Sequence, residues 1–239
     1  MRLKNFVIPL FLQTLVACTH TNSVEGSKNQ SERSNEKSAI SRAQLGLAYL
    51  KHKETVKARE NLLKAYAIDP NNLYVLLSLA HYYDYVGEIA LADSMYRKAV
   101  AYFPNDGYVM NNYGTFLCKQ NQYIKAQEYF KSAADTSYVF IASSYENAGL
   151  CSLKSGDIPH ANRSFERALA YEPDRIVSLL QSCRIEIEQQ QYAKAEAKII
   201  HFHNTYGVRS DTLKMLIELA QHQNNSQLEL EYTQQLNQL

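Results

Sequence analysis

The sequence from 73 to 104 reads LYVLLSLAHYYDYVGEIALADSMYRKAVAYFP. Its pattern of small, large apolar and proline positions restarts every 34 or 35 residues, and the six starts are Ala39, Leu73, Gly107, Ala142, Ile176 and Ser210. A constant period between about 20 and 50 residues is typical of stacked repeats, because each unit buries its apolar face only against its neighbours. The period therefore predicts a repeat array and favours a binding function.

Four positions recur when each unit is numbered from its start. Positions 20 and 27 are alanine in the first four units. Position 8 is small in the first five units: Gly46, Ala80, Gly114, Gly149 and Cys183. Position 24 is large in the same units: Leu62, Tyr96, Phe130, Phe165 and Ile199. Small residues let two helix backbones approach closely while the large residue fills the space beside them, so the spacing predicts two packed helices in each unit.

Position 15 predicts where the first helix of each unit ends. It is occupied by Lys53, Gly87, Asn121, Gly156, Gln190 and Asn224. Glycine and asparagine tolerate a left-handed backbone, so four of the six units carry a helix stop there. Proline at position 32 ends the second helix in three units, whereas the third unit has Tyr138.

These positions resemble the tetratricopeptide repeat, with Leu45-Gly46 and Tyr49 forming the opening motif of unit one. The resemblance implies an all-α fold, a right-handed α-solenoid of about six helix-turn-helix repeats over residues 39–239. Unit six has Glu229 and Leu236 where alanines are expected, as in a terminal capping pair.

The N-terminus predicts export and a lipid anchor. A basic start is followed by a short apolar run, and residues 15–18 read Leu-Val-Ala-Cys, which resembles a bacterial lipobox. We expect residues 1–17 to be a lipoprotein signal peptide and Cys18 to be lipidated. An ordinary signal peptide followed by an unmodified cysteine is the alternative. Thr19 stands where an aspartate would favour inner-membrane retention, so the resemblance implies the periplasmic face of the outer membrane.

Residues 18–38 predict a disordered tether between the lipid anchor and the repeats. After Cys18 the segment is rich in Ser, Asn, Glu and Lys and has only Val24 as a larger apolar residue. Such a composition buries too little apolar surface to fold by itself.

The composition argues against several functional classes. The net charge is +1 and no basic stripe is present, which argues against nucleic acid as a partner. The seven histidines are scattered, and we find no phosphate-binding loop, Ser-His-Asp pattern or metal-ligand spacing. We expect no enzyme activity, cofactor, metal or small-molecule substrate.

Cys118 and Cys151 are candidates for a disulfide. They occupy positions 12 and 10 of the first helices of adjacent units, which should stack side by side. An oxidising periplasm would allow the bond, but the sequence does not give the distance between their Cα atoms. Two reduced, buried thiols are the alternative, and Cys183 is expected to be a core residue. A thiol-redox enzyme would more typically carry a Cys-x-x-Cys motif, which is absent.

The tetratricopeptide fold implies a concave groove lined by positions 2, 5, 9 and 12 of each first helix. The candidate groove residues are Ile40, Ala43, Leu47, Leu50, Tyr74, Leu77, His81, Tyr108 and Asn111. The four from unit one are apolar, and exposed apolar patches usually mark a partner site. We expect an apolar segment as the ligand, unless the tether or a neighbouring helix covers this face.

Two stretches, Asn111–Cys118 (NNYGTFLC) and Glu146–Cys151 (ENAGLC), sharpen the resemblance. Together with the lipobox and six repeats, they are similar to the PilF/PilW family of type IV pilus biogenesis lipoproteins. The resemblance implies a pilotin that helps the secretin PilQ reach the outer membrane and assemble into its multimeric pore. A different envelope adaptor, for β-barrel assembly or peptidoglycan hydrolases, is the alternative.

Overall fold

The computed structural model describes residues 23–136, 139 and 141–239. Within these residues the regular elements are twelve α-helices, and no strand occurs among them. The helices are α1 (Ser23–Lys51), α2 (Thr55–Ile68), α3 (Leu73–Val86), α4 (Ile89–Tyr102), α5 (Gly107–Lys119), α6 (Tyr123–Thr136), α7 (Ile141–Ser155), α8 (Ile158–Tyr171), α9 (Ile176–Glu188), α10 (Tyr192–Tyr206), α11 (Ser210–His222) and α12 (Ser226–Leu236).

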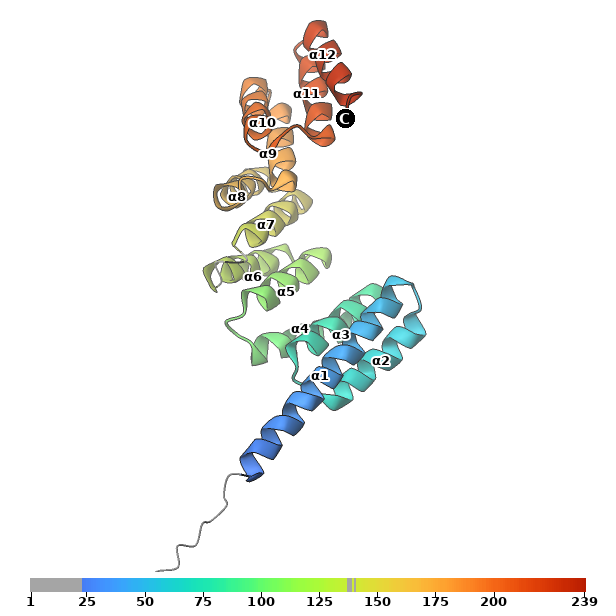
Figure 1. Ribbon diagram of the computed structural model, residues 1–239. Coiled ribbons are helices and arrows are strands. Elements are labelled where there is room, and N and C mark those ends of the chain that lie inside the picture. The colour runs from blue at the N-terminus through green and yellow to red at the C-terminus, as the bar shows by residue number, and fades with distance from the viewer. Residues whose placement is uncertain (1–22, 137–138, 140) are drawn as a thin grey trace, which may run out of the picture.

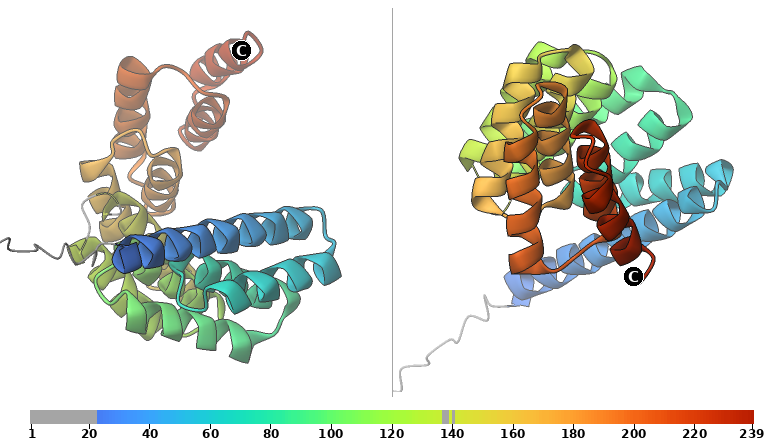
Figure 2. Two further views of the ribbon diagram at one scale, coloured as in Figure 1. Left: turned by 60° about the horizontal axis from the view of Figure 1, so that its bottom comes forward. Right: turned by 90° about the horizontal axis from the view of Figure 1, so that it is seen from above.

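The helices form six pairs, which stack into a right-handed α-solenoid (Figure 1). Helices α3, α5, α9 and α11 begin at the unit starts expected from the sequence, and α7 begins one residue earlier. Successive pairs are rotated relative to one another, so the array curves between α1 and α12 (Figure 2). The fold class expected from the 34-residue period is confirmed.

Helix α1 begins well before the expected start of unit one. It runs without interruption from Ser23, so residues 23–38 are helical and the prediction of a disordered tether is wrong for this segment. Residues 30–38 are exposed, which means that packing does not hold them. Extending an existing helix costs far less than nucleating one, and the packed part of α1, from Ala39 onward, supplies the nucleus. Residues 18–22, including Cys18, lie outside the described residues, as does Tyr138.

The turn between the two helices is the same in all six units. Position 15 has a positive φ in each, including 62° at Lys53 and 60° at Gln190. The fold therefore imposes the left-handed conformation on two residues that do not favour it, as well as on the expected glycines and asparagines.

The small residue at position 8 faces the large residue at position 24 of the same unit. A Cβ atom added to Gly149 would lie 2.6 Å from Cε1 of Phe165, and one added to Gly114 would lie 2.8 Å from Cε1 of Phe130. Real Cβ atoms do not approach other atoms this closely, so the two aromatic rings require glycine opposite them.

The apolar interior is divided along the array. One cluster of buried side chains extends through units one to four, and a second lies in units five and six. Phe165 of α8 and Ile185 of α9 pack together between them. Each unit thus buries its apolar surface mainly against its neighbours, as expected for a solenoid.

Candidate partner-binding groove

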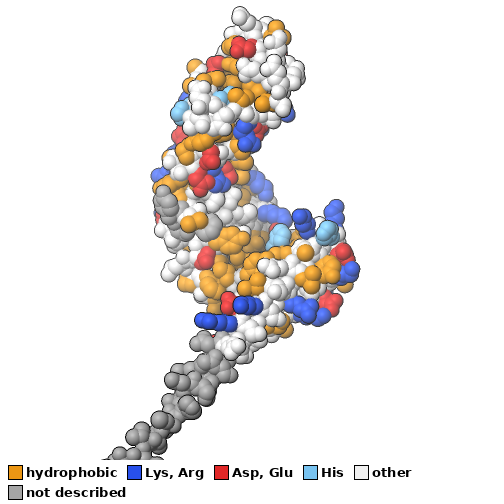
Figure 3. Space-filling view, viewed as in Figure 1, with side chains coloured by type: hydrophobic (Ala, Val, Ile, Leu, Met, Phe, Trp, Pro, Cys, Tyr) orange, Lys and Arg blue, Asp and Glu red, His pale blue; other side chains and the backbone are white. Residues whose placement is uncertain are grey.

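A groove of about 600 Å³ lies on the concave side of the N-terminal half of the array. Its lining residues come from α1, α3, α4, α5 and the turns before α3 and after α4. They are Glu36, Ile40, Leu47, Asn72, Leu73, Tyr74, Leu77, Ser78, His81, Tyr96, Phe103, Tyr108 and Asn112. Figure 3 shows apolar side chains, coloured orange, at the hollow between the N-terminal helices and the rest of the array. We call this set of residues the groove.

Six of the expected residues line the groove: Ile40, Leu47, Tyr74, Leu77, His81 and Tyr108. Tyr74 and Tyr108 keep 39% and 47% of their surface exposed. Their rings are available to a ligand in the free protein.

Two expected groove residues in unit one belong to the core instead. Ala43 is 0% exposed and Leu50 is 4% exposed, and both pack in the N-terminal core cluster. They lie three residues before and four residues after Gly46, so they share its face of α1. Gly46 faces Leu62 of α2. The assignment of Ala43 and Leu50 to the groove is therefore wrong.

Asn111 is also misplaced. Its Oδ1 accepts a hydrogen bond from Nδ2 of Asn147 at 3.0 Å, which links α5 to α7. The next residue, Asn112, lines the groove instead. Positions 2, 6 and 9 form one row on a helix. Most groove residues of the first helices belong to this row, and Leu77 is the one residue at position 5 that also lines the groove, whereas none at position 12 does.

Several groove residues were not expected from the sequence. Tyr96 belongs to α4, a second helix, and Phe103 directly follows that helix. Glu36 belongs to the segment expected to be a disordered tether. The repeat pattern gave Tyr96 only a packing role at position 24. The row of positions 2, 6 and 9 would have found Ser78 and Asn112.

The floor of the groove remains uncharged. Burial, followed by the nearby Asp84 carboxylate, raises the pKa of Tyr96 to about 12. The Tyr96 ring stacks on Tyr113 with centroids 5.5 Å apart and lies 5.1 Å from the ring of Phe116. A neutral, aromatic floor below exposed tyrosines and leucines suits an apolar ligand.

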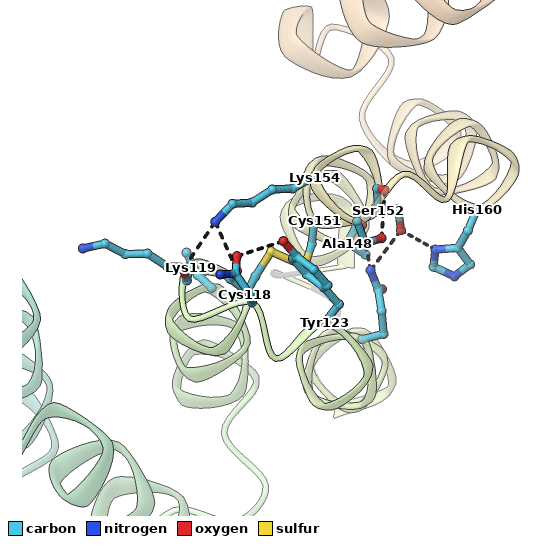
Figure 4. Close-up of a disulfide and its surroundings, with 12 residues drawn as sticks. Cys118, Lys119, Tyr123, Ala148, Cys151, Ser152, Lys154 and His160 are labelled. Carbon is cyan, nitrogen blue, oxygen red and sulfur yellow. Dashed lines mark hydrogen bonds between the residues drawn. A yellow bond between two sulfur atoms is a disulfide. The ribbon is translucent and has the colours of Figure 1, made fainter. Parts of the chain in front are cut away.

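Cys118 and Cys151 form a disulfide between α5 and α7, with their Cα atoms 5.8 Å apart (Figure 4). Nearby, Nζ of Lys154 donates hydrogen bonds to the carbonyl oxygens of Cys118 at 3.4 Å and Lys119 at 3.3 Å. Cys183 is buried with a free thiol, and burial raises the pKa of that thiol to about 12. The bond joins units three and four.

Other kinds of site find little support in the described part of the chain. No three His, Cys, Asp or Glu side chains gather there in a way that could hold a metal ion. Nor does any helix among the described residues have the length and apolar character needed to cross a membrane.

Comparisons with known proteins agree with this geometry. The tetratricopeptide repeat family matches residues 95–128, from α4 into α6. The type IV pilus assembly protein PilF of Pseudomonas aeruginosa is 33% identical over 178 residues, which cover 74% of this chain and 71% of that protein. An uncharacterised protein of Haemophilus influenzae is 34% identical over 142 residues, 59% of this chain and 79% of its own length.

Solved structures give the same relationship. The structure of Pseudomonas aeruginosa PilF matches with a TM-score of 0.69 and 30% identity, covering 86% of this chain and 93% of that one. The structure of PilW, described as a widely conserved type IV pilus biogenesis factor, matches with a TM-score of 0.66 and 27% identity, covering 83% and 91%.

Proposed function

The chain belongs to the PilF family of tetratricopeptide-repeat proteins of type IV pilus assembly, and we propose that it is a pilotin. In this role it is an adaptor that binds an apolar segment of a secretin subunit in the groove and promotes secretin multimerisation at the outer membrane. The function is one of binding, since the family's repeats are scaffolds for protein–protein contacts.

One observation carries this proposal. The groove combines exposed aromatic rings, Tyr74 and Tyr108, with the apolar side chains of Ile40, Leu47 and Leu77 in one concave surface. A concave, largely apolar surface with a few polar groups at its edge is the usual form of a binding site. An apolar segment placed there would bury the two tyrosines and Leu47.

We further propose that Cys18 carries the lipid that anchors the protein to the outer membrane. The lipobox-like Leu15-Val16-Ala17-Cys18 supports this. The part of α1 that precedes Ala39 would then act as a helical spacer between the membrane and the groove. Cys18→Ser should abolish fatty-acid labelling and outer-membrane fractionation, and unchanged labelling would contradict the anchor.

The groove is tested by charging two of its side chains. Leu47→Asp with Tyr74→Asp should keep a near-native circular dichroism spectrum, because both side chains are partly exposed. The variant should lose secretin multimers and surface pili, since an unpaired charge against an apolar segment is strongly unfavourable.

The matched control charges two apolar residues outside the groove. Val56 and Ile124 are 80% and 81% exposed, and Val56→Asp with Ile124→Asp should leave secretin multimers and pili unchanged. If the groove variant folds and still assembles the secretin, the partner binds elsewhere. If the native protein purifies with barrel-assembly or wall enzymes rather than a secretin, the alternative envelope adaptor is correct.

A further inference from the structure

The row of groove residues on the first helices continues beyond the groove to a set of lysines. In units one to three the groove residues of the first helices lie mostly at positions 2, 6 and 9, and position 13 is the next on the same face of the helix, one turn further. Position 13 is lysine in units one, three and four: Lys51, Lys119 and Lys154. We call these three residues the basic edge. All three side chains are exposed.

The contacts of Lys119 and Lys154 link the ends of three first helices. Nζ of Lys119 in α5 lies 3.0 Å from both carboxylate oxygens of Asp84 in α3. Nζ of Lys154 in α7 reaches back to the carbonyl oxygens of Cys118 and Lys119 at the end of α5. Lys119 and Lys154 therefore lie side by side at the ends of α5 and α7, and Lys51 holds the same position at the end of α1.

The positive charge of the basic edge is only partly neutralised. Asp84 pairs with Lys119, carbonyl oxygens leave the charge of Lys154 in place, and Lys51 makes no ion pair with any described residue. Lysine and arginine side chains are visible along the hollowed side of the molecule in Figure 3. Three lysines against one aspartate leave an excess of positive charge along this border.

The opposite end of the groove has a different character. Glu36 lies one turn before Ile40 on α1, and Asn72 directly precedes α3. The groove thus has an apolar middle, an acid at the N-terminal end of the row and lysines beyond its C-terminal end. Charges arranged in this way select a partner of complementary charge and fix its orientation.

We propose that the segment bound in the groove is a peptide with acidic side chains beside its apolar residues, on the side that faces the basic edge. This inference rests on the proposed function, because it concerns the ligand of the same groove. The apolar residues bind between Leu47 and Tyr108, and the acids lie against Lys51, Lys119 and Lys154. The acids add selectivity and a salt-dependent part of the affinity.

The test uses two fluorescein-labelled synthetic peptides and the detergent-solubilised full chain. Both peptides have the core Leu-Val-Phe-Leu-Val, flanked by three aspartates in one and by three lysines in the other. We expect the acidic peptide to bind about fivefold more tightly in 50 mM NaCl, which is about the effect of a few exposed ion pairs. In 500 mM NaCl the difference should fall below about twofold, because salt screens exposed charges.

Charge reversal locates the effect. Lys51→Glu should weaken binding of the acidic peptide about threefold in 50 mM NaCl and leave the fold intact, since Lys51 is exposed. Lys131→Glu is the matched control, because exposed Lys131 lies on α6, a second helix, and the same change in net charge occurs away from the row. It should leave the affinity unchanged.

The outcomes separate this inference from the proposed function. Equal affinity for the two peptides, or equal losses in Lys51→Glu and Lys131→Glu, would overturn the inference while the apolar groove stands. If neither peptide binds, the groove is not a binding site for apolar segments, and both proposals fail.

Discussion

Leu47 and Leu50 are three residues apart on α1, yet their surroundings differ. Leu47 lines the groove and is only partly buried, whereas Leu50 is 4% exposed within the core of units one to four. An unpaired charge in a packed core is among the most destabilising changes known. A charge at Leu47 therefore tests binding, whereas a charge at Leu50 tests folding.

We predict that Leu50→Asp lowers the free energy of unfolding by at least about 3 kcal/mol, whereas Leu47→Asp lowers it by about 1 kcal/mol or less. Urea unfolding followed by circular dichroism measures both. Similar stability of the two variants would mean that Leu50 does not belong to the core.

Lys53 has a left-handed backbone, with a φ of 62° that costs a residue with a Cβ atom more than it costs glycine. Lys53→Gly should raise the free energy of unfolding by about 0.5–1 kcal/mol. Lys51→Gly, two residues earlier at the last residue of α1, is the control and should lower it by about 0.5 kcal/mol. Thermal unfolding distinguishes the two, and a loss of stability in both variants would contradict the strain at Lys53.

At the scale of elements, Glu146 connects α7 to the start of α9. Its carboxylate accepts hydrogen bonds from Nη2 of Arg175 at 2.8 Å, from Oγ of Ser178 at 2.7 Å and from the backbone N–H of Ser178 at 3.2 Å. Burial of the carboxylate acts to raise its pKa, but the hydrogen bonds from Arg175 and Ser178 outweigh burial, and the pKa lies below the usual 4.5. A residue of unit four thus caps a helix of unit five.

Because the folded pKa of Glu146 is lowered, its contribution to stability is complete above about pH 4.5 and is lost as the pH falls through the folded pKa. Glu146→Gln should lower the free energy of unfolding by about 2 kcal/mol at pH 7. The difference from the unmodified protein should shrink steadily below pH 4.5. Glu172→Gln removes a more exposed partner of Arg175 and should cost about 0.5 kcal/mol or less. A pH-independent effect of Glu146→Gln would contradict the assignment.

At the scale of the whole molecule, the disulfide joins units three and four inside the larger of the two core clusters. It spans a sequence separation of 33 residues, which corresponds to about 3–4 kcal/mol in the chain-entropy description. Reduction should therefore lower the melting temperature and reduce amide protection first in units one to four, while units five and six keep theirs.

The variant Cys118→Ser with Cys151→Ser provides the control for this prediction. It should melt at the temperature of the reduced protein and show no further response to reductant. A melting temperature that does not respond to reductant in the unmodified protein would mean that the bond contributes nothing to stability. Cys183, buried with a raised pKa, should react with thiol reagents only after unfolding.

The sequence alone was sufficient for the architecture, because a repeat array is held together by contacts that recur at a fixed spacing. Gly46, Gly114 and Gly149, together with the large residues that follow each of them after 16 residues, specify how the two helices of a unit pack. This spacing can be read directly from the sequence. Glycine or asparagine at position 15 likewise predicted four of the six left-handed turns. Six of the nine groove candidates followed from the repeat family's geometry.

What only the tertiary structure decided is which side of each helix remains available to a partner. Ala43, Leu50 and Asn111 occupy repeat positions expected to face the groove. Ala43 and Leu50 are instead buried in the core, and Asn111 is hydrogen-bonded to Asn147 of α7. Tyr96 reaches the groove from α4 and Phe103 from the residue after α4. Glu36 reaches it because α1 continues beyond its packed part. Local spacing determines a helix and its nearest partner, whereas exposure depends on the sum of contacts from residues tens of positions apart, which no single unit of the sequence contains.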